Sequence, residues 1–230
     1  MNQSDFERFI VRAKGNLEPR SRLTIPVTTI HNRCIGSLAC LDRNMIDDQR
    51  IIAVMTKWRN SFMTSFLTRF SATECRTRTW LEQLVLPSHD RLLFVIFLPN
   101  NDPAGQIGLC NIIENSAELD NVTRGEGGAD KDLTYNAAIA LLKWTFEKRP
   151  FKEITLGVLS NNVRALNLYR KLGFLEIKRH TLTRVIDGDT IRFALDQQNG
   201  ALEDYEYVRM RLSKDQLNQK YPSLSYVESE

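Results

Sequence analysis

The chain has 230 residues, of which 42% are hydrophobic and 26% are charged. This balance supplies enough apolar side chains for a buried core, so it excludes a disordered chain, a collagen and a coiled coil. The formal net charge is only +3, a surplus too small to indicate a nucleic-acid partner by itself. The length fits one domain of ordinary to large size, or a domain with an appendage.

Cysteine and histidine are too scattered to hold a metal ion. The four cysteines form no C-x-x-C pair and the three histidines stand apart from them, so we expect free thiols, a reducing compartment and no metal site. The N-terminus lacks the apolar centre of a signal peptide. The longest strongly apolar run, 92–98, is far shorter than the ~20 residues that cross a bilayer. We therefore expect a cytoplasmic protein without a membrane partner.

The first half of the chain predicts two helices followed by strands. Residues 23–30 suggest one strand in an otherwise poorly patterned start. From Asp47, apolar residues recur at helical spacing as far as Trp58. Ser71 and Glu74 have the spacing of a capping box, which predicts a second helix that ends near Pro87. Three strands are expected next, at 92–98, 106–113 and 117–123. The first two form a hairpin across turn residues.

The second half predicts alternating helices and strands. A helix over 133–145 must end near Pro150, and 153–159 alternates like a strand. The next helix, 161–172, has Asn162 as its N-cap and Gly173 just past its end. Strands are expected around 174–186 and 204–212, joined by a long loop, 187–204, which is a candidate cover for a ligand cleft.

This order of elements predicts a mixed α/β (α+β layered) domain rather than a repeated doubly wound one. We divide the chain into an N-terminal extension packed on the core (1–45), the main domain (46–214) and a C-terminal tail (215–230).

A glycine-rich segment, 124–129, joins the 117–123 strand to the following helix. Glycines at a helix start let the backbone approach a ligand, and the free N–H groups there favour phosphate oxygens. The spacing fits neither the P-loop nor the dinucleotide-binding pattern. A flexible turn before the helix explains the segment equally well.

Two motifs together resemble the GNAT acetyltransferase superfamily. The downstream motif has the form V…N-x-x-A-x-x-x-Y-x-K-x-G-F, and the upstream motif has the form R/Q-x-x-G-x-G/A. The matching residues here are Val158, Asn162, Ala165, Tyr169, Lys171, Gly173 and Phe174, with Arg124, Gly127 and Ala129 upstream.

The resemblance implies a mixed central sheet with helices on both faces, splayed between two parallel strands, 117–123 and 153–159. It implies acetyl-CoA as co-substrate, bound between these strands, and a primary amine as the small-molecule acceptor. Asn162 is an N-cap in any case, and the resemblance adds a hydrogen bond to the cofactor. The cofactor-binding residues expected are Val122, Arg124, Gly125, Gly127, Gly128, Ala129, Asn162, Arg164 and Arg170.

Tyr169 is the catalytic acid that the resemblance implies, because a phenol is a neutral donor at pH 7. Without the motif, it would be taken for a core aromatic. The acceptor amine is mostly protonated and must lose a proton. The candidate bases are Asp120, Glu114 and Glu118, and a water relay without a dedicated base stays open. Cys110 is expected to be a buried strand cysteine.

Basic residues concentrate in 150–186, where seven Lys and Arg stand against two Glu, a surplus of seven minus two, or +5. They either form a solvated helix face or bind the phosphates of CoA. In the second interpretation, Arg164 and Arg170 are the best placed.

The acceptor is indicated by a second resemblance, to GNAT enzymes that acetylate amino groups of nucleotide-linked sugars. Its residues are Trp58, Arg59 and Asn60, with Trp80 in the next helix. The tryptophans either stack on a base or sugar or pack helices on the sheet, and Arg59 would hold a phosphate. Protein N-termini and polyamines remain alternative acceptors, and a non-catalytic CoA sensor or assembly module remains an alternative function. The oligomeric state, a homodimer included, stays open.

Overall fold

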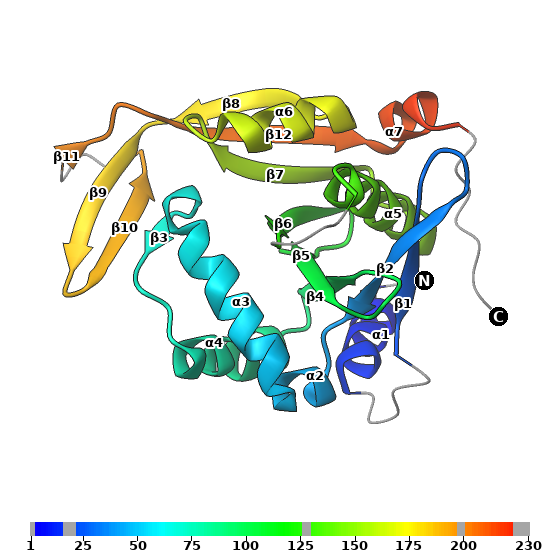
Figure 1. Cartoon of the computed structure of the whole chain (residues 1–230). Coiled ribbons are helices and arrows are strands. Elements are labelled where there is room, and N and C mark those ends of the chain that lie inside the picture. Colours follow the sequence, from blue (N-terminus) through cyan, green and yellow to red (C-terminus); the bar gives the residue numbers. More distant parts are fainter. Residues whose placement is uncertain (1–2, 16–21, 126–129, 197–200, 223–230) are drawn as a thin grey trace.

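The computed structural model describes residues 3–15, 22–125, 130–196 and 201–222. An eight-stranded sheet forms its centre, in the order β1-β2-β4-β5-β6-β7-β12-β8 (Figure 1). Neighbouring strands are antiparallel, except that β6 and β7 are parallel. In sheet order the strands are β1 (Thr24–Thr28), β2 (Cys34–Cys40), β4 (Leu92–Phe97), β5 (Pro103–Cys110), β6 (Ser116–Arg124), β7 (Glu153–Leu159), β12 (Tyr207–Ser213) and β8 (Leu175–His180).

Helices cover both faces of this sheet, as the sequence predicted. The larger core cluster joins one face to α1 (Gln3–Gly15), α5 (Leu133–Lys148), α6 (Val163–Leu172) and α7 (Lys214–Lys220). A second cluster joins the other face to α2 (Arg43–Asp47), α3 (Gln49–Ser61) and α4 (Glu74–Trp80), which continues into a π-helical turn, Leu81–Val85. The mixed, layered fold class is confirmed.

The first 45 residues contribute two strands to the central sheet, where the sequence predicted one. Ile25 and Val27 of β1 and Phe6 and Ile10 of α1 are buried in the larger core cluster. The second strand, β2, has the sequence CIGSLAC, whose small residues have little intrinsic preference for a strand. Its antiparallel pairing with β4, far along the chain, forms the strand.

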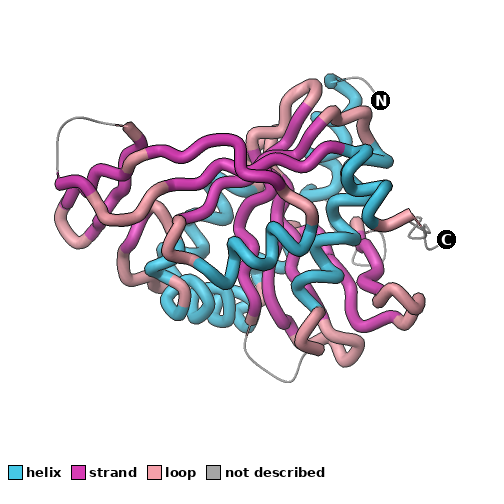
Figure 2. Tube along the Cα trace, turned by 90° about the horizontal axis from the view of Figure 1, so that it is seen from above, coloured by secondary structure: helices cyan, strands magenta, loops and turns pink. Residues whose placement is uncertain are grey.

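A smaller, four-stranded sheet lies at one end of the molecule (Figures 1 and 2). The predicted continuous strand 174–186 is wrong, because β8 ends at His180 and β9 starts a new sheet. The predicted long loop 187–204 is also wrong, because a tight turn at Gly188, with φ +58°, leads directly into β10. The strands of this sheet, in order, are β11 (Ala201–Leu202), β9 (Leu182–Asp187), β10 (Thr190–Leu195) and β3 (Thr68–Arg69).

The ends of the predicted helices follow local capping. Asn162 caps α6 through a hydrogen bond that its side chain accepts from the Ala165 N–H, and Gly173 ends the helix in the left-handed region, with φ +105°. Both predictions are confirmed. The second predicted helix begins later than Ser71, because Thr73 is the residue whose side chain caps α4.

Within the described ranges, no helix is both long and apolar enough to cross a membrane. In the same part of the chain, no three His, Cys, Asp or Glu side chains gather as metal ligands. All four cysteines are free thiols.

Asp42 ties the start of α2 to the segment before β1. Its carboxylate is fully buried, accepts from the Met45 N–H and pairs with Arg22 at 2.6 Å. We expect Asp42→Ala to lower the free energy of unfolding by about 3 kcal/mol, because it removes a buried carboxylate and leaves the half-buried Arg22 and the N–H of Met45 without their partner. Urea titration measures this change. Glu82→Ala, which breaks an exposed pair with Arg43, is the control and should cost under ~1 kcal/mol. Equal losses in the two variants would contradict the prediction.

Candidate active site

The pairing of β6 with β7 ends early. Register pairs join Ser116 to Glu153, Ala117 to Ile154 and Glu118 to Thr155, and the pairing ends there. On its other edge, β6 carries a bulge, since Thr123 pairs with Gln106 but Asp120 pairs with Gly108. One extra residue therefore lies in β6 at 121–122, and Asn121 has φ +53°. A bulge twists a strand away from its neighbour, so the two parallel strands diverge beyond Glu118.

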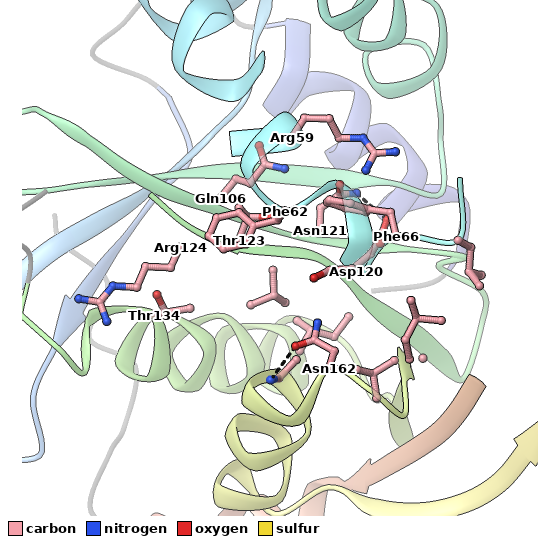
Figure 3. Close-up of a pocket in the computed structure, with 18 of the residues that line it drawn as sticks. Arg59, Phe62, Phe66, Gln106, Asp120, Asn121, Thr123, Arg124, Thr134 and Asn162 are labelled. Atoms are coloured by element: carbon pink, nitrogen blue, oxygen red, sulfur yellow. Dashed lines mark hydrogen bonds between the residues drawn. The ribbon is translucent and has the colours of Figure 1, made fainter. Parts of the chain in front are cut away.

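A cleft of about 730 Å³ opens at this divergence. Its walls come from α3 and α4 with the segment between them, from β6, and from the starts of α5 and α6. Figure 3 shows Arg59 and Asn162 on opposite sides of it, with Asp120 and Thr123 of β6 between them. The cleft therefore connects the two faces of the sheet through the opening between β6 and β7.

Two buried polar side chains in this cleft each have an oxygen without a hydrogen-bond partner among the described residues. Gln106 is 7% exposed and Thr134 is 9% exposed, and the Gln106 Oε1 and Thr134 Oγ1 are both unpaired. Both side chains line the cleft (Figure 3). Because buried polar atoms nearly always have a partner, this pair fits a site that binds a polar ligand.

Tyr169 lies on α6, is 8% exposed, and belongs both to the core and to the wall of the cleft. Burial raises the pKa of its phenol above the ordinary value, and the nearby charge of Asp120 raises it further. The phenol therefore keeps its proton at physiological pH and is suited to donate it.

Of the three candidate bases, two line the cleft. Asp120 pairs with Arg91 at 2.9 Å and accepts from the Asn121 side chain at 2.7 Å. Glu118 pairs with Arg209 at 3.0 Å. Glu114 is exposed and lies outside the cleft wall. Cys110 is buried as predicted and lies outside the cleft wall, and burial with the Asp120 charge raises the pKa of its thiol, which disfavours the thiolate.

Arg59 lies in the wall of the cleft among aromatic side chains. Its guanidinium stacks on Phe66, 3.7 Å from the ring centre, and its Nη2 donates to the Thr68 carbonyl at 2.6 Å. The Nη1 is buried without a hydrogen-bond partner, and burial lowers the pKa of the guanidinium to about 10. Among the described residues no carboxylate pairs with it, so it can receive an anion of the ligand.

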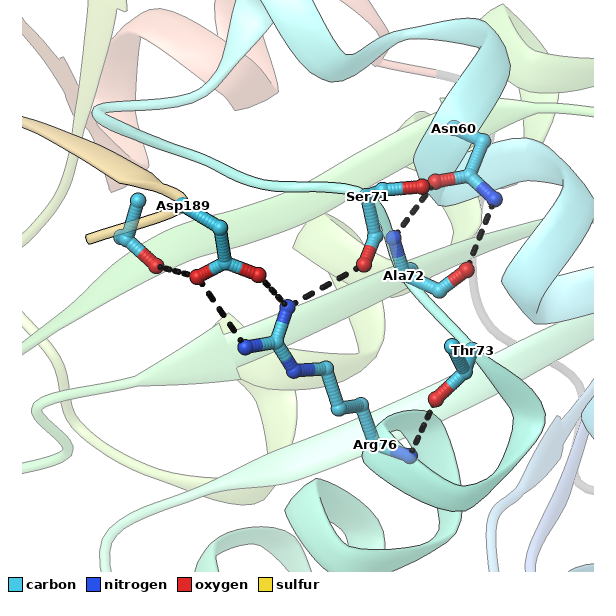
Figure 4. Close-up of polar contacts among 7 residues, drawn as sticks. Asn60, Ser71, Ala72, Thr73, Arg76 and Asp189 are labelled. Atoms are coloured by element: carbon cyan, nitrogen blue, oxygen red, sulfur yellow. Dashed lines mark hydrogen bonds and ion pairs between the residues drawn. The ribbon is translucent and has the colours of Figure 1, made fainter.

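Of the other three residues predicted to bind the acceptor, one lines the cleft and two do not. Trp80 lines the cleft. Trp58 is 3% exposed in the core between helices and sheet, which is the packing role. Asn60 bonds both the N–H and the carbonyl of Ala72 (Figure 4), and it shapes the chain between α3 and α4 rather than the cleft wall.

Only some of the predicted cofactor-binding residues line the cleft. Val122, Arg124, Asn162 and Arg164 line the cleft. Gly125 lies behind it, where a Cβ would press on the Ala104 backbone and the Trp58 ring. Gly127, Gly128 and Ala129 lie outside the described residues.

The local surplus of positive charge is largely neutralised. Arg170 lies outside the cleft wall and pairs with Glu176 at 2.5 Å. Arg179 pairs with Glu176 and with Glu206, each at 2.9 Å. At the cleft itself, Arg164 is joined by Lys171, which sequence reasoning did not select and which pairs with Asp132 at 3.2 Å.

Sequence reasoning also missed four residues that line the cleft, namely Arg91, Gln106, Thr134 and Tyr207. None of them belongs to either motif, so the sequence carried no signal for them. Their selection depends on strand register and on the faces that the folded sheet presents.

Known families support this arrangement. Residues 43–175, more than half of the chain, match the model of the acetyltransferase (GNAT) domain. No curated protein sequence matches the chain significantly.

Several solved structures share the fold at low identity. A spermidine N-acetyltransferase from Vibrio cholerae, in complex with CoA and spermine, has a TM-score of 0.60 at 18% identity, with 79% of this chain and 97% of that chain covered. FdhC, a nucleotide-linked sugar GNAT in its apo form, has a TM-score of 0.59 at 14% identity, with 86% and 95% covered.

A third neighbour is the Salmonella typhimurium acetyltransferase that modifies the N-terminal serine of ribosomal protein L7/L12. It has a TM-score of 0.59 at 14% identity, with 83% of this chain and 99% of that chain covered. At these identities the likeness shows the fold alone. The family match shows more, because it spans the diverging strands and the helix that carries Tyr169: the chain belongs to the GNAT acetyltransferase domain family.

Proposed function

We propose that this protein transfers an acetyl group from acetyl-CoA to the primary amine of a nucleotide-linked amino sugar. The observation that carries the transfer step is the buried phenol of Tyr169 at the opening between β6 and β7. The choice of acceptor is supported by Arg59 and by the pairing of the carboxylates in the cleft.

Acetyl-CoA would lie along β6, beyond the end of its pairing with β7. Backbone groups there have lost their strand partner, so they are available to the amides of the pantetheine arm. Gln106 and Thr134 supply unpaired polar atoms. Arg124, Arg164 and Lys171 supply positive charge for the phosphates at the same side of the cleft.

In the proposed reaction the acceptor amine first loses a proton, which Asp120 takes either directly or through water. The neutral nitrogen then attacks the thioester carbonyl, so that an N–C bond forms and the C–S bond breaks. Tyr169 gives its proton to the departing sulfur. The proton that Asp120 holds then passes to the Tyr169 phenolate, through water, which restores the carboxylate and the neutral phenol for the next turnover.

The charges in the cleft favour an anionic acceptor over a polyamine. Among the described residues, the carboxylates of the cleft wall are Glu118, Asp120 and Asp132, and each is paired with a cation. A polyamine needs unpaired carboxylates, and these are already neutralised. Arg59, in contrast, has an unused donor and no acidic partner in the described part of the chain, as a phosphate-binding arginine requires.

The first test is a panel of amines with acetyl-CoA, followed by release of free thiol. We expect turnover on nucleotide-linked amino sugars and much less on spermidine or on peptides with a free N-terminus. Turnover confined to spermidine or to peptides would replace the proposed acceptor. No turnover on any amine, with CoA still bound, would favour a sensor.

Tyr169→Phe tests the transfer step. Removing the proton donor should lower kcat by at least about 100-fold, while the affinity for CoA, measured by calorimetry, stays within about two-fold. A variant that turns over normally would exclude Tyr169 as the acid.

Arg59→Gln tests the acceptor. Loss of a charge-assisted hydrogen bond should raise the KM for a nucleotide-linked sugar by about 10- to 100-fold. The KM for the same amino sugar without its nucleotide should not change, because that substrate carries no phosphate. Arg43→Gln, in an exposed pair with Glu82, is the matched control. An equal rise for both substrates would contradict a phosphate-binding role.

A further inference from the structure

A row of polar side chains crosses the sheet at the point where β6 and β7 begin to diverge. Arg209 of β12 pairs with Glu118 of β6 at 3.0 Å, and it donates to the Thr155 hydroxyl of β7 at 3.2 Å. Glu118 and Thr155 form the last register pair of the two parallel strands. Arg209 therefore ties three strands together at the base of the cleft.

Tyr207 lies on the same face of β12, two residues before Arg209. In register, Tyr207 is opposite Leu159, and Arg209 is opposite Gly157. A Cβ added at Gly157 would collide with the hydroxyl and the ring of Tyr207. The Tyr207 side chain therefore crosses β7 at Gly157, where the side chain of any other residue would block it. Both residues line the cleft.

This face of the sheet is the one that α3 and α4 cover. Leu93 belongs to the core cluster of those helices, and the register joins Leu93 to Gly108 and Gly108 to Asp120. Residues paired in register share a face, as do residues two apart on one strand. Tyr207 therefore lies on the side of Asp120 and Glu118, whereas Tyr169 belongs to α6, on the opposite face.

The Tyr207 hydroxyl has a hydrogen available to donate to a ligand. Burial raises the pKa of this phenol, and the nearby Glu118 charge raises it further, so the group stays protonated. The nearby Arg209 guanidinium acts in the opposite direction on this pKa, and because a guanidinium only donates hydrogen bonds, it cannot accept the Tyr207 hydrogen. Among the described residues, no group accepts it.

We propose that Tyr207 binds the acceptor, donating a hydrogen bond to an oxygen of the acceptor next to its amine, and that Gly157 is a glycine so that the phenol can reach this place. The proposal rests on the proposed acetyl transfer in this cleft. It requires an acceptor with an oxygen beside its amine, which an amino sugar and a peptide N-terminus have and a polyamine lacks. The alternative is that the ring only covers Gly157 as packing.

Tyr207→Phe separates these two roles, because it removes the hydroxyl and keeps the ring over Gly157. We expect the KM for the acceptor to rise about ten-fold, with the KM for acetyl-CoA and the calorimetric affinity for CoA unchanged. The matched control is Tyr205→Phe. That phenol accepts from Arg69 at 2.7 Å and lies outside the cleft wall, so its loss should leave both KM values unchanged.

Gly157→Ala gives a second, independent measurement. The added methyl group displaces the phenol, so we expect the same rise in the acceptor KM. The double variant Gly157→Ala, Tyr207→Phe should be little worse than either single one, because both remove one interaction. Thermal unfolding and CoA affinity establish that each variant is folded.

An acceptor KM that is unchanged in Tyr207→Phe, with normal turnover by the unaltered protein, would overturn this inference and leave the proposed function intact. A rise in the KM for acetyl-CoA alone would also overturn it. If the unaltered protein acetylates no amine, the proposed function fails and this inference fails with it.

Discussion

The parallel pairing of β6 with β7 stops after three residue pairs, yet neither strand is loose. On its outer edge β6 keeps its ladder with β5, and β7 is paired with β12 along its whole length, from Glu153 to Leu159. Each of the two diverging strands is therefore fixed by hydrogen bonds to the strand on its other side, β5 for β6 and β12 for β7. The fold can keep an opening in the middle of its sheet because the hydrogen bonds lost there are few and both margins are fixed.

That opening lets side chains from two faces of the sheet act on one space. Asp120 connects them electrostatically. It is paired with Arg91, it accepts from Asn121, and its charge raises the pKa of Tyr169 on the other side. The carboxylates of the cleft are thus paired with cations. The groups that remain for a ligand are the Tyr169 phenol, which stays protonated, and Arg59, which has an unused donor. This combination fits acetyl transfer to an acceptor that carries negative charge.

Features set by local sequence were predictable, and those set by distant pairing were not. Asn162 and Gly173 bound α6 because caps depend on neighbouring residues. The β9–β10 hairpin is an exception, because its six register pairs are local and its turn at Gly188 was overlooked. Its pairing with β3, more than 100 residues earlier, is distant and could not be predicted.

The candidate site divides in the same way. The GNAT motif predicted where Tyr169 would lie, but the fate of each cation depends on neighbours that the motif does not contain. Arg170 pairs with Glu176 instead of lying in the expected phosphate site. Trp58 packs in the core between helices and sheet instead of lining the expected acceptor site. Tyr207 could not be predicted from the residues near it in sequence, because it depends on a glycine of the adjacent strand.

The family model covers most of the cleft wall. Gln106, Thr134, Asn162 and Tyr169 all lie within residues 43–175, and so do Arg59 and Trp80. The cleft and its surroundings receive further residues from beyond that range. Tyr207 comes from β12, and Asp189, in the β9–β10 turn, pairs with Arg76 of α4 at 2.9 Å (Figure 4).

That ion pair holds the β9–β10 hairpin against α4, whose Arg76 lines the cleft. The strands after residue 175 are not equally free to change. β12 pairs with β7 along its whole length, and its Arg209 joins Glu118 of β6 to Thr155 of β7, so it helps to fix the diverging strands. The β9–β10 hairpin takes no part in that pairing, so under the proposed function it is the part of the cleft surroundings that can vary with the acceptor while the diverging strands and Tyr169 are kept.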